Sequence, residues 1–206
     1  MSSKQINYFV TTALIAAKLD NANKIAKQLL LTASNARAVA LRAGDSAAGF
    51  KPLTDFIDQL ARVTIASSKQ INVLATQLSR VSANKMRTDN AICHFERADR
   101  IATDYAYVES LSPAYGRIKR SELALNNKYV GEIFRLNDAL DELARELRTA
   151  VILATLSRVE ASQAALLYQE SLNGVADNVE LSAQQIKTLI EEAKKLAQEL
   201  HQDANV

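Results

Sequence analysis

Residues 35–50 read NARAVALRAGDSAAGF, and a proline follows two positions later at Pro52. The first half of this stretch is rich in alanine, which favours helix, and the second half holds Gly44 and Gly49. Glycine commonly ends a helix. Proline is tolerated in the first turn of a helix, because the N–H that it lacks would be unpaired there. The stretch therefore predicts that one helix ends, the chain turns within residues 44–52, and a second helix returns.

The other glycine and proline residues divide the chain further. The 206 residues include five glycines and two prolines. Pro113 and Gly116 mark a second break, and Asn173-Gly174 predicts a third break as the end of a helix. Only Gly131 falls within a periodic segment, where glycine costs about 1 kcal/mol relative to alanine. Four long segments separated by three breaks are predicted.

Apolar residues repeat at alternating spacings of three and four in each segment. The repeat occupies residues 8–43, 53–81, 129–168 and 179–200. A seven-residue repeat kept over several heptads is typical of helices packed knobs-into-holes, and strand-like alternation is absent from the sequence. Because short connections make neighbouring helices antiparallel, the predicted fold is all-α, with elongated antiparallel coiled-coil helical hairpins that form a four-helix bundle.

One elongated helical domain is expected over residues 1–206. It would contain a hairpin over 4–110, with its tip at 44–52, and a second hairpin over 118–203. Two assemblies remain open at this point. Either one chain closes its own bundle, or hairpins from two chains pair as a homodimer.

Composition restricts the classes of function. The chain has 25 basic and 23 acidic residues, a net charge of +2, and therefore lacks the basic excess of a dedicated nucleic-acid binder. The single cysteine, Cys93, cannot form an internal disulfide, which favours a reducing, cytoplasmic setting. The apolar run at residues 8–17 is too short to cross a bilayer, so no membrane insertion is expected.

The sequence contains no combination of residues that predicts catalysis or metal binding. His94 and His201 are the only histidines. Cys93 and His94 are adjacent, so on a helix their side chains point about 100° apart and do not converge on one metal ion. The chain also lacks a phosphate-binding loop, a Cys-x-x-Cys motif and a nucleophile elbow. We therefore expect no enzymatic activity, no catalytic residue, no cofactor and no metal.

The stretch at residues 35–50 resembles the membrane-distal hairpin tip of the cytoplasmic signalling domain of methyl-accepting chemotaxis receptors. Asn35-Ala36 match the start of that tip, and Arg42-Ala43-Gly44 match the residues that lead into its turn. Gly49-Phe50 match the residues that leave the turn, and Asp45 stands where the family has glutamate. The spacing is kept without a gap.

The resemblance covers residues 29–61 and extends, as heptad repeat alone, to residue 81. The chain departs from the family at Val39, Phe56 and Asp58, where the family has glutamate, glutamate and arginine. In the family this tip packs receptors together and binds the histidine kinase and its coupling adaptor. The resemblance implies a coiled-coil signalling or adaptor protein that acts by protein–protein contact. Its candidate partners are a chemosensory kinase, a coupling adaptor or receptors.

Six residues around the turn form the candidate partner-binding set: Asn35, Arg42, Asp45, Phe50, Phe56 and Asp58. Two roles remain open for Phe50, because its ring can cover the end of the hairpin or contact a partner. Arg42 and Asp45 are spaced to pair across the turn. Gln184-Gln185 and Glu191-Glu192 are interpreted as solvated surface rather than as methylation sites.

Two other functions remain open. The chain can be a structural helical-bundle scaffold or assembly factor unrelated to chemotaxis, whose second hairpin takes the place of a second receptor subunit. It can also be a small-molecule sensor with a pocket near the second break. The tyrosines that would line this pocket are Tyr105, Tyr107, Tyr115 and Tyr129.

Overall fold

The computed structural model describes residues 3–101 and 108–204. Four long helices account for most of them: α1 Ser3–Ala43, α2 Phe50–Ile101, α3 Ser112–Gln163 and α4 Leu166–Ala204. Two short 3-10 helices, η1 Gly44–Ala47 and η2 Val108–Leu111, precede α2 and α3. No strand occurs within these two described ranges, so the predicted all-α class is confirmed.

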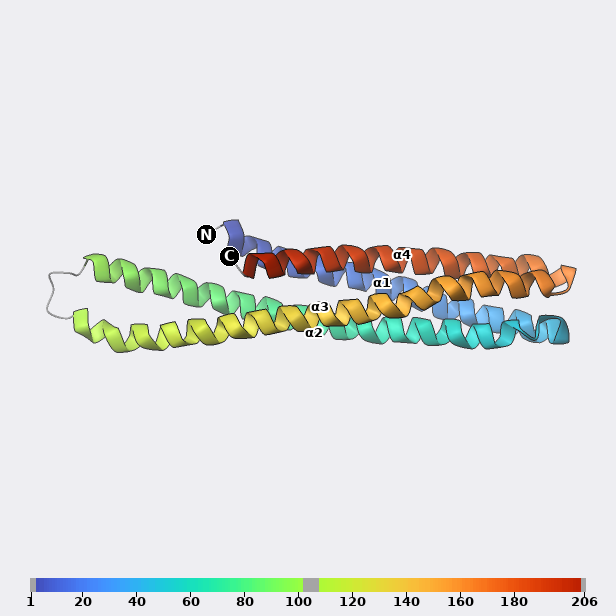
Figure 1. The fold of residues 1–206 in the computed structure, drawn as a ribbon, viewed down its shortest axis with the longest axis horizontal. Helices are drawn as coiled ribbons and strands as arrows, with labels where there is room; N and C mark the ends of the chain where they lie inside the picture. The colour runs from blue at the N-terminus through green and yellow to red at the C-terminus, as the bar shows by residue number, and fades with distance from the viewer. Residues whose placement is uncertain (1–2, 102–107, 205–206) are drawn as a thin grey trace.

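Each long helix packs against two others. α1 contacts α2 and α4, and α3 likewise contacts α2 and α4. Figure 1 shows that the α1–α2 turn and the α3–α4 turn lie at the same end of an elongated molecule. At the other end, α2 and α3 continue beyond the first residue of α1 and the last residue of α4. The molecule therefore has a section of four helices and an extension of two.

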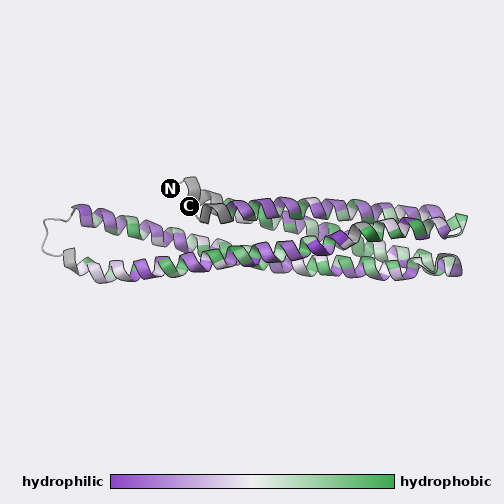
Figure 2. Ribbon diagram, in the orientation of Figure 1, coloured by the Kyte–Doolittle hydropathy of each residue, from purple (hydrophilic) through white to green (hydrophobic). Residues whose placement is uncertain are grey.

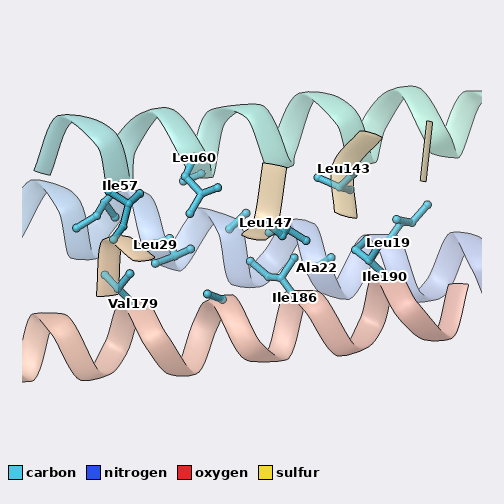
Figure 3. Close-up of a cluster of buried hydrophobic side chains, with 14 of the residues drawn as sticks. Leu19, Ala22, Leu29, Ile57, Leu60, Leu143, Leu147, Val179, Ile186 and Ile190 are labelled. Carbon is cyan, nitrogen blue, oxygen red and sulfur yellow. The ribbon is translucent and has the colours of Figure 1, made fainter. Parts of the chain in front are cut away.

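The core occupies the four-helix section. Side chains from all the long helices meet there, as Figure 3 shows for Leu19 of α1, Ile57 of α2, Leu143 of α3 and Ile186 of α4. The contiguous core ends at Val81 on α2 and begins at Tyr129 on α3. We call the part outside it, residues 82–101 and 112–128, the arm.

Alanines recur among the larger buried side chains of α1 and α4. These alanines are Ala22, Ala26, Ala33, Ala36 and Ala40 on α1, and Ala176, Ala183, Ala193 and Ala197 on α4. The buried faces of α2 and α3 carry larger side chains, such as Leu78 and Leu136. Small side chains let helix backbones approach closely, and the larger residues opposite fill the remaining space.

The first turn falls within the predicted interval, because α1 ends at Ala43 and α2 begins at Phe50. Gly44 has a φ of +59°, a left-handed conformation that residues with a Cβ rarely adopt. The Ser46 hydroxyl donates a hydrogen bond of 2.8 Å to the carbonyl oxygen of Ala43 and so satisfies one carbonyl at the end of α1. The left-handed backbone of the turn therefore favours glycine at position 44.

The third break lies ten residues before the predicted position. α3 ends at Gln163, α4 begins at Leu166, and Gly174 lies inside α4. Ala164 adopts an extended conformation, with φ −69° and ψ 161°, that ends α3. The Gln169 side-chain amide donates hydrogen bonds to the carbonyl oxygens of Ser162 (3.1 Å) and Ala164 (2.8 Å). The prediction of a break at Asn173-Gly174 was wrong, because a glutamine side chain stabilises a turn without glycine or proline.

The second break begins α3 at Ser112, with Pro113 in the first turn as the missing proline N–H allows. α2 is helical without interruption through residues 82–90, where the sequence has few core residues. Gly116 and Gly131 both lie within α3.

Candidate partner-binding surface at the hairpin tip

The two turns meet at one end of the molecule, which we call the tip and define as residues 41–56 and 159–168. The Tyr168 hydroxyl donates a hydrogen bond of 3.3 Å to the backbone carbonyl oxygen of Arg42, which joins the start of α4 to the end of α1. Glu160 of α3 lies so close to Gly49 that a Cβ added there would overlap its carboxylate. Both hairpins therefore contribute to the tip.

The polar members of the predicted set lie on or near the surface. Asn35, Arg42 and Asp45 are exposed, and Asp58 is half-buried. Arg42 and Asp45 form no ion pair with each other, although both lie in the described part of the chain. Asn35 lies two turns of helix before the tip, whereas Arg42 and Asp45 lie in it. These two charges are available to a partner.

Phe50 and Phe56 have opposite environments. Phe50 begins α2 on the same face as Leu53 and Ile57, and its side chain is 0% exposed. It covers the end of the core from inside, so its ring does not reach a partner in this conformation. Phe56 is 53% exposed. Of the two aromatic residues in the predicted set, only Phe56 therefore presents its ring at the surface.

Ion pairs within the chain engage several charges near the tip. Arg37 of α1 pairs with Asp55 of α2, and the Arg37 Nε donates a hydrogen bond of 3.5 Å to the Thr54 hydroxyl. These two interactions link the two helices of the first hairpin. Asp58 accepts a hydrogen bond of 2.6 Å from Nε of Arg62, one helical turn later. This hydrogen bond raises the pKa of the Arg62 guanidinium above its ordinary value. Asp58 is thus partly engaged before any partner arrives.

Exposed leucines at the tip were not predicted from the sequence. Leu166 and Leu167, at the start of α4, are 86% and 83% exposed, and Leu41 near the end of α1 is also exposed. The misplaced third break hid the two leucines, since it assigned them to the middle of a helix. In the sequence they could have been recognised as two adjacent leucines outside the heptad positions. Figure 2 shows that hydrophobic residues also line α3 next to the turn.

The tyrosines considered for a sensor pocket do not gather in one place. Tyr105 and Tyr107 lie outside the described residues. Tyr115 lines a pocket of about 550 Å³ in the arm, and its hydroxyl donates a hydrogen bond of 3.2 Å to Glu96. Tyr129 is buried in the core and does not line this pocket. The described tyrosines thus give no common binding site.

Other classes of site find little support in the described residues. No group of three or more histidine, cysteine, aspartate or glutamate residues there could hold a metal ion. Cys93 and His94 are both exposed on α2. No helix in the same ranges has an apolar stretch long enough to span a bilayer.

Comparison with known proteins assigns no function to the tip. The chain matches no family model, no curated protein and no solved structure. The residues that support a function are therefore those that the two turns bring together.

Proposed function

We propose that this chain is a chemoreceptor-like coiled-coil signalling or adaptor protein that binds protein partners through its tip. One observation carries the proposal: the two turns lie side by side, and exposed apolar side chains surround them. Leu41, Phe56, Leu166 and Leu167 are exposed there beside the charge of Arg42. Protein interfaces combine an apolar centre with a polar rim, and exposed apolar patches commonly mark them.

In this proposal the four long helices form an elongated antiparallel coiled-coil bundle within one chain. The second hairpin would occupy the position that a second subunit holds in a dimer of hairpins. Two observations support this arrangement: buried residues follow the heptad repeat on all four helices, and each helix packs against two neighbours. A single free thiol at Cys93 fits a cytoplasmic protein.

The proposed contact set is Asn35, Arg42, Asp45, Phe56 and Asp58, with Leu41, Leu166 and Leu167 added from the structure. Phe50 holds the turn from inside and contributes only indirectly. The resemblance at residues 29–61 suggests a chemosensory kinase, its coupling adaptor or a receptor signalling domain as partners.

The proposal is tested by measuring the affinity of the purified chain for each of these three partners from the same cell. Phe56→Ala is the test variant, and Phe134→Ala is its control, because Phe134 is equally exposed (57%) but lies on α3 far from the tip. Since a buried aromatic often dominates an interface, we expect Phe56→Ala to weaken binding at least tenfold and Phe134→Ala to leave it unchanged. Failure of the well-folded chain to bind any of the three would contradict the proposed partners, and equal losses in both variants would contradict the proposed site.

The alternative is a helical scaffold or assembly factor with partners unrelated to chemotaxis. Two of the positions that depart from the family favour it. Val39 packs against the core, and Asp58 bonds to Arg62, so both side chains are engaged within the chain. Binding of a non-chemosensory protein that is lost in Phe56→Ala would support this alternative while keeping the same site.

A further inference from the structure

The arm carries an excess of positive charge. Residues 82–101 and 112–128 hold eight basic and four acidic residues, a net charge of +4, although the whole chain has a net charge of only +2. The nearly balanced composition of the chain therefore conceals a local excess. Figure 1 shows that the arm lies at the end of the molecule opposite the two turns of the tip.

Five basic side chains of the arm are exposed, and none of them forms an ion pair with another described side chain. We call these five residues the basic set: Arg87 and Arg97 on α2, and Arg117, Arg120 and Lys128 on α3.

The carboxylates of the arm leave the charge of the basic set in place. Asp89 pairs with Lys85 at 3.4 Å, and Glu122 pairs with Lys119 at 3.2 Å, so two of the four acids are offset by lysines outside the set. A third acid, Glu96, accepts a hydrogen bond of 3.2 Å from a tyrosine hydroxyl of α3. The positive charge of the five residues therefore stays available to a partner.

Most of the basic set lies on the outer side of the two helices. Lys85 occupies a heptad position that is buried in the four-helix section, and Arg87 comes two residues later, about 200° round the helix. Arg97 on α2, and Arg117 and Lys128 on α3, are likewise two residues from such positions. These four side chains therefore point away from the side of the arm that continues the core.

We propose that the basic set binds the phosphate backbone of a double-stranded nucleic acid. Four of its five residues are arginines, whose guanidinium groups donate paired hydrogen bonds to phosphate oxygens. Interfaces with nucleic acid are more polar and much more positively charged than interfaces between proteins. This proposal goes beyond the proposed function, whose partners bind the tip at the other end of the molecule.

Other negatively charged partners match the arm less well. Within the described residues of the arm, only two large apolar side chains are exposed, Ile101 and Leu123. The arm thus lacks both the apolar centre of a protein interface and the apolar face with which a helix enters a membrane surface. Single strands stack their bases on exposed aromatic rings, whereas Phe95 and Tyr115 of the arm pack against each other, with ring centroids 6.1 Å apart.

The width of the arm limits the contact to phosphates. One helix with its side chains is about 10–12 Å across, and the major groove of DNA is about 12 Å wide. Two helices side by side are too wide to enter this groove. Because a duplex carries one negative charge per about 1.7 Å of its axis, phosphates lie within reach of the basic set on any sequence. Binding is therefore independent of sequence and dependent on salt.

Fluorescence anisotropy of a short labelled DNA duplex, titrated with the full chain, tests the binding. The logarithm of the association constant should fall linearly with the logarithm of the salt concentration, with a slope of about −4 for five phosphate contacts. A second DNA sequence and an RNA duplex of equal length should bind with similar affinity. Absence of binding at low salt, or a preference of more than tenfold for one duplex, would overturn the proposal.

A pair of double variants tests the site. Arg117→Gln with Arg120→Gln removes two charges from the basic set. Arg145→Gln with Arg148→Gln is the matched control, because these two arginines lie on the same helix outside the arm, have the same spacing, are exposed, and form no ion pair with another described side chain. The arm variant should weaken duplex binding at least tenfold and make the salt slope shallower by about 2, whereas the control should change both much less. Equal losses in the two variants would contradict the site.

The competing partners are tested with the same proteins. Vesicles of phosphatidylcholine and phosphatidylglycerol should sediment without the chain, polyglutamate should not displace the duplex at equal charge, and a single strand should bind more weakly than the duplex. Vesicle binding or polyglutamate binding that is tighter than duplex binding and lost in the arm variant would assign the basic set to a lipid surface or an acidic protein. Tighter binding of the single strand would likewise contradict the duplex.

Discussion

At the scale of single residues, the two glycines of the first turn have different roles. Gly44 supplies a left-handed backbone, whereas Gly49 supplies space beside Glu160. A left-handed conformation penalises every residue with a Cβ, because the Cβ approaches the following carbonyl oxygen. A Cβ at Gly49 would meet only the end of a flexible glutamate side chain, which can move aside.

We therefore predict that Gly44→Ala destabilises the chain and Gly49→Ala does not. Gly44→Ala should lower the free energy of unfolding by about 1 kcal/mol. Gly49→Ala should leave it nearly unchanged, because Glu160 can adopt another rotamer. Urea denaturation of both variants measures the difference. A larger loss in Gly49→Ala than in Gly44→Ala would show that the turn is built differently.

At the scale of elements, the arm differs from the four-helix section in its packing. Among the described side chains of the arm, Ile92 is the only buried apolar residue. Ion pairs within one helix, Lys85 with Asp89 and Lys119 with Glu122, occupy positions where the four-helix section has apolar residues. Figure 2 shows largely hydrophilic colouring on the α2 half of the arm. Little apolar burial therefore holds the two helices of the arm together.

We predict that the arm opens more readily than the rest of the molecule. Hydrogen exchange followed by mass spectrometry should show faster exchange at α2 amides in residues 84–101 than in residues 53–78, because local opening is easier where few apolar contacts are lost. The two segments belong to one helix, so helical structure alone gives no reason for a difference. Equal protection of both segments would contradict this prediction.

The three breaks show how far the sequence predicts the elements. Gly44 favours the left-handed backbone of the first turn, and Pro52 suits the first turn of the helix that follows. The first break could therefore be located from the sequence. The third break could not, because Ala164 and Ala165 have no such preference and the turn depends on Gln169, which comes five residues after Ala164. A glutamine side chain that bonds carbonyl oxygens in a neighbouring turn leaves no local pattern to recognise.

The candidate site, like the breaks, was predictable from the sequence only in part. Arg42, Asp45 and Phe56 were chosen near the turn that the sequence locates, and the structure exposes all three. The burial of Phe50 depends on how its ring packs into the core, which the sequence alone did not decide. Leu166 and Leu167 reach the tip only because the third break lies at residues 164–165. The exposure of the two leucines thus depends on the turn that Gln169 stabilises.

At the scale of the whole molecule, both hairpins of one chain turn at the same end. The contact between Tyr168 and Arg42 and the closeness of Glu160 to Gly49 are the links across the tip. If the second hairpin lay elsewhere, the exposed leucines of α4 would be far from Phe56, and no joint surface would exist. The proposed docking site therefore requires this arrangement.

The distance between spin labels at Asp45 and Leu167 tests this arrangement most directly. Both residues are exposed and lie in the two turns, so labels there should leave the core intact. Pulsed electron resonance should give a short distance that does not change on dilution with unlabelled chain, and a much longer distance for the control pair Asp45 and Ser112. A long distance between Asp45 and Leu167, or a short one that disappears on dilution with unlabelled chain, would contradict a tip built from one chain.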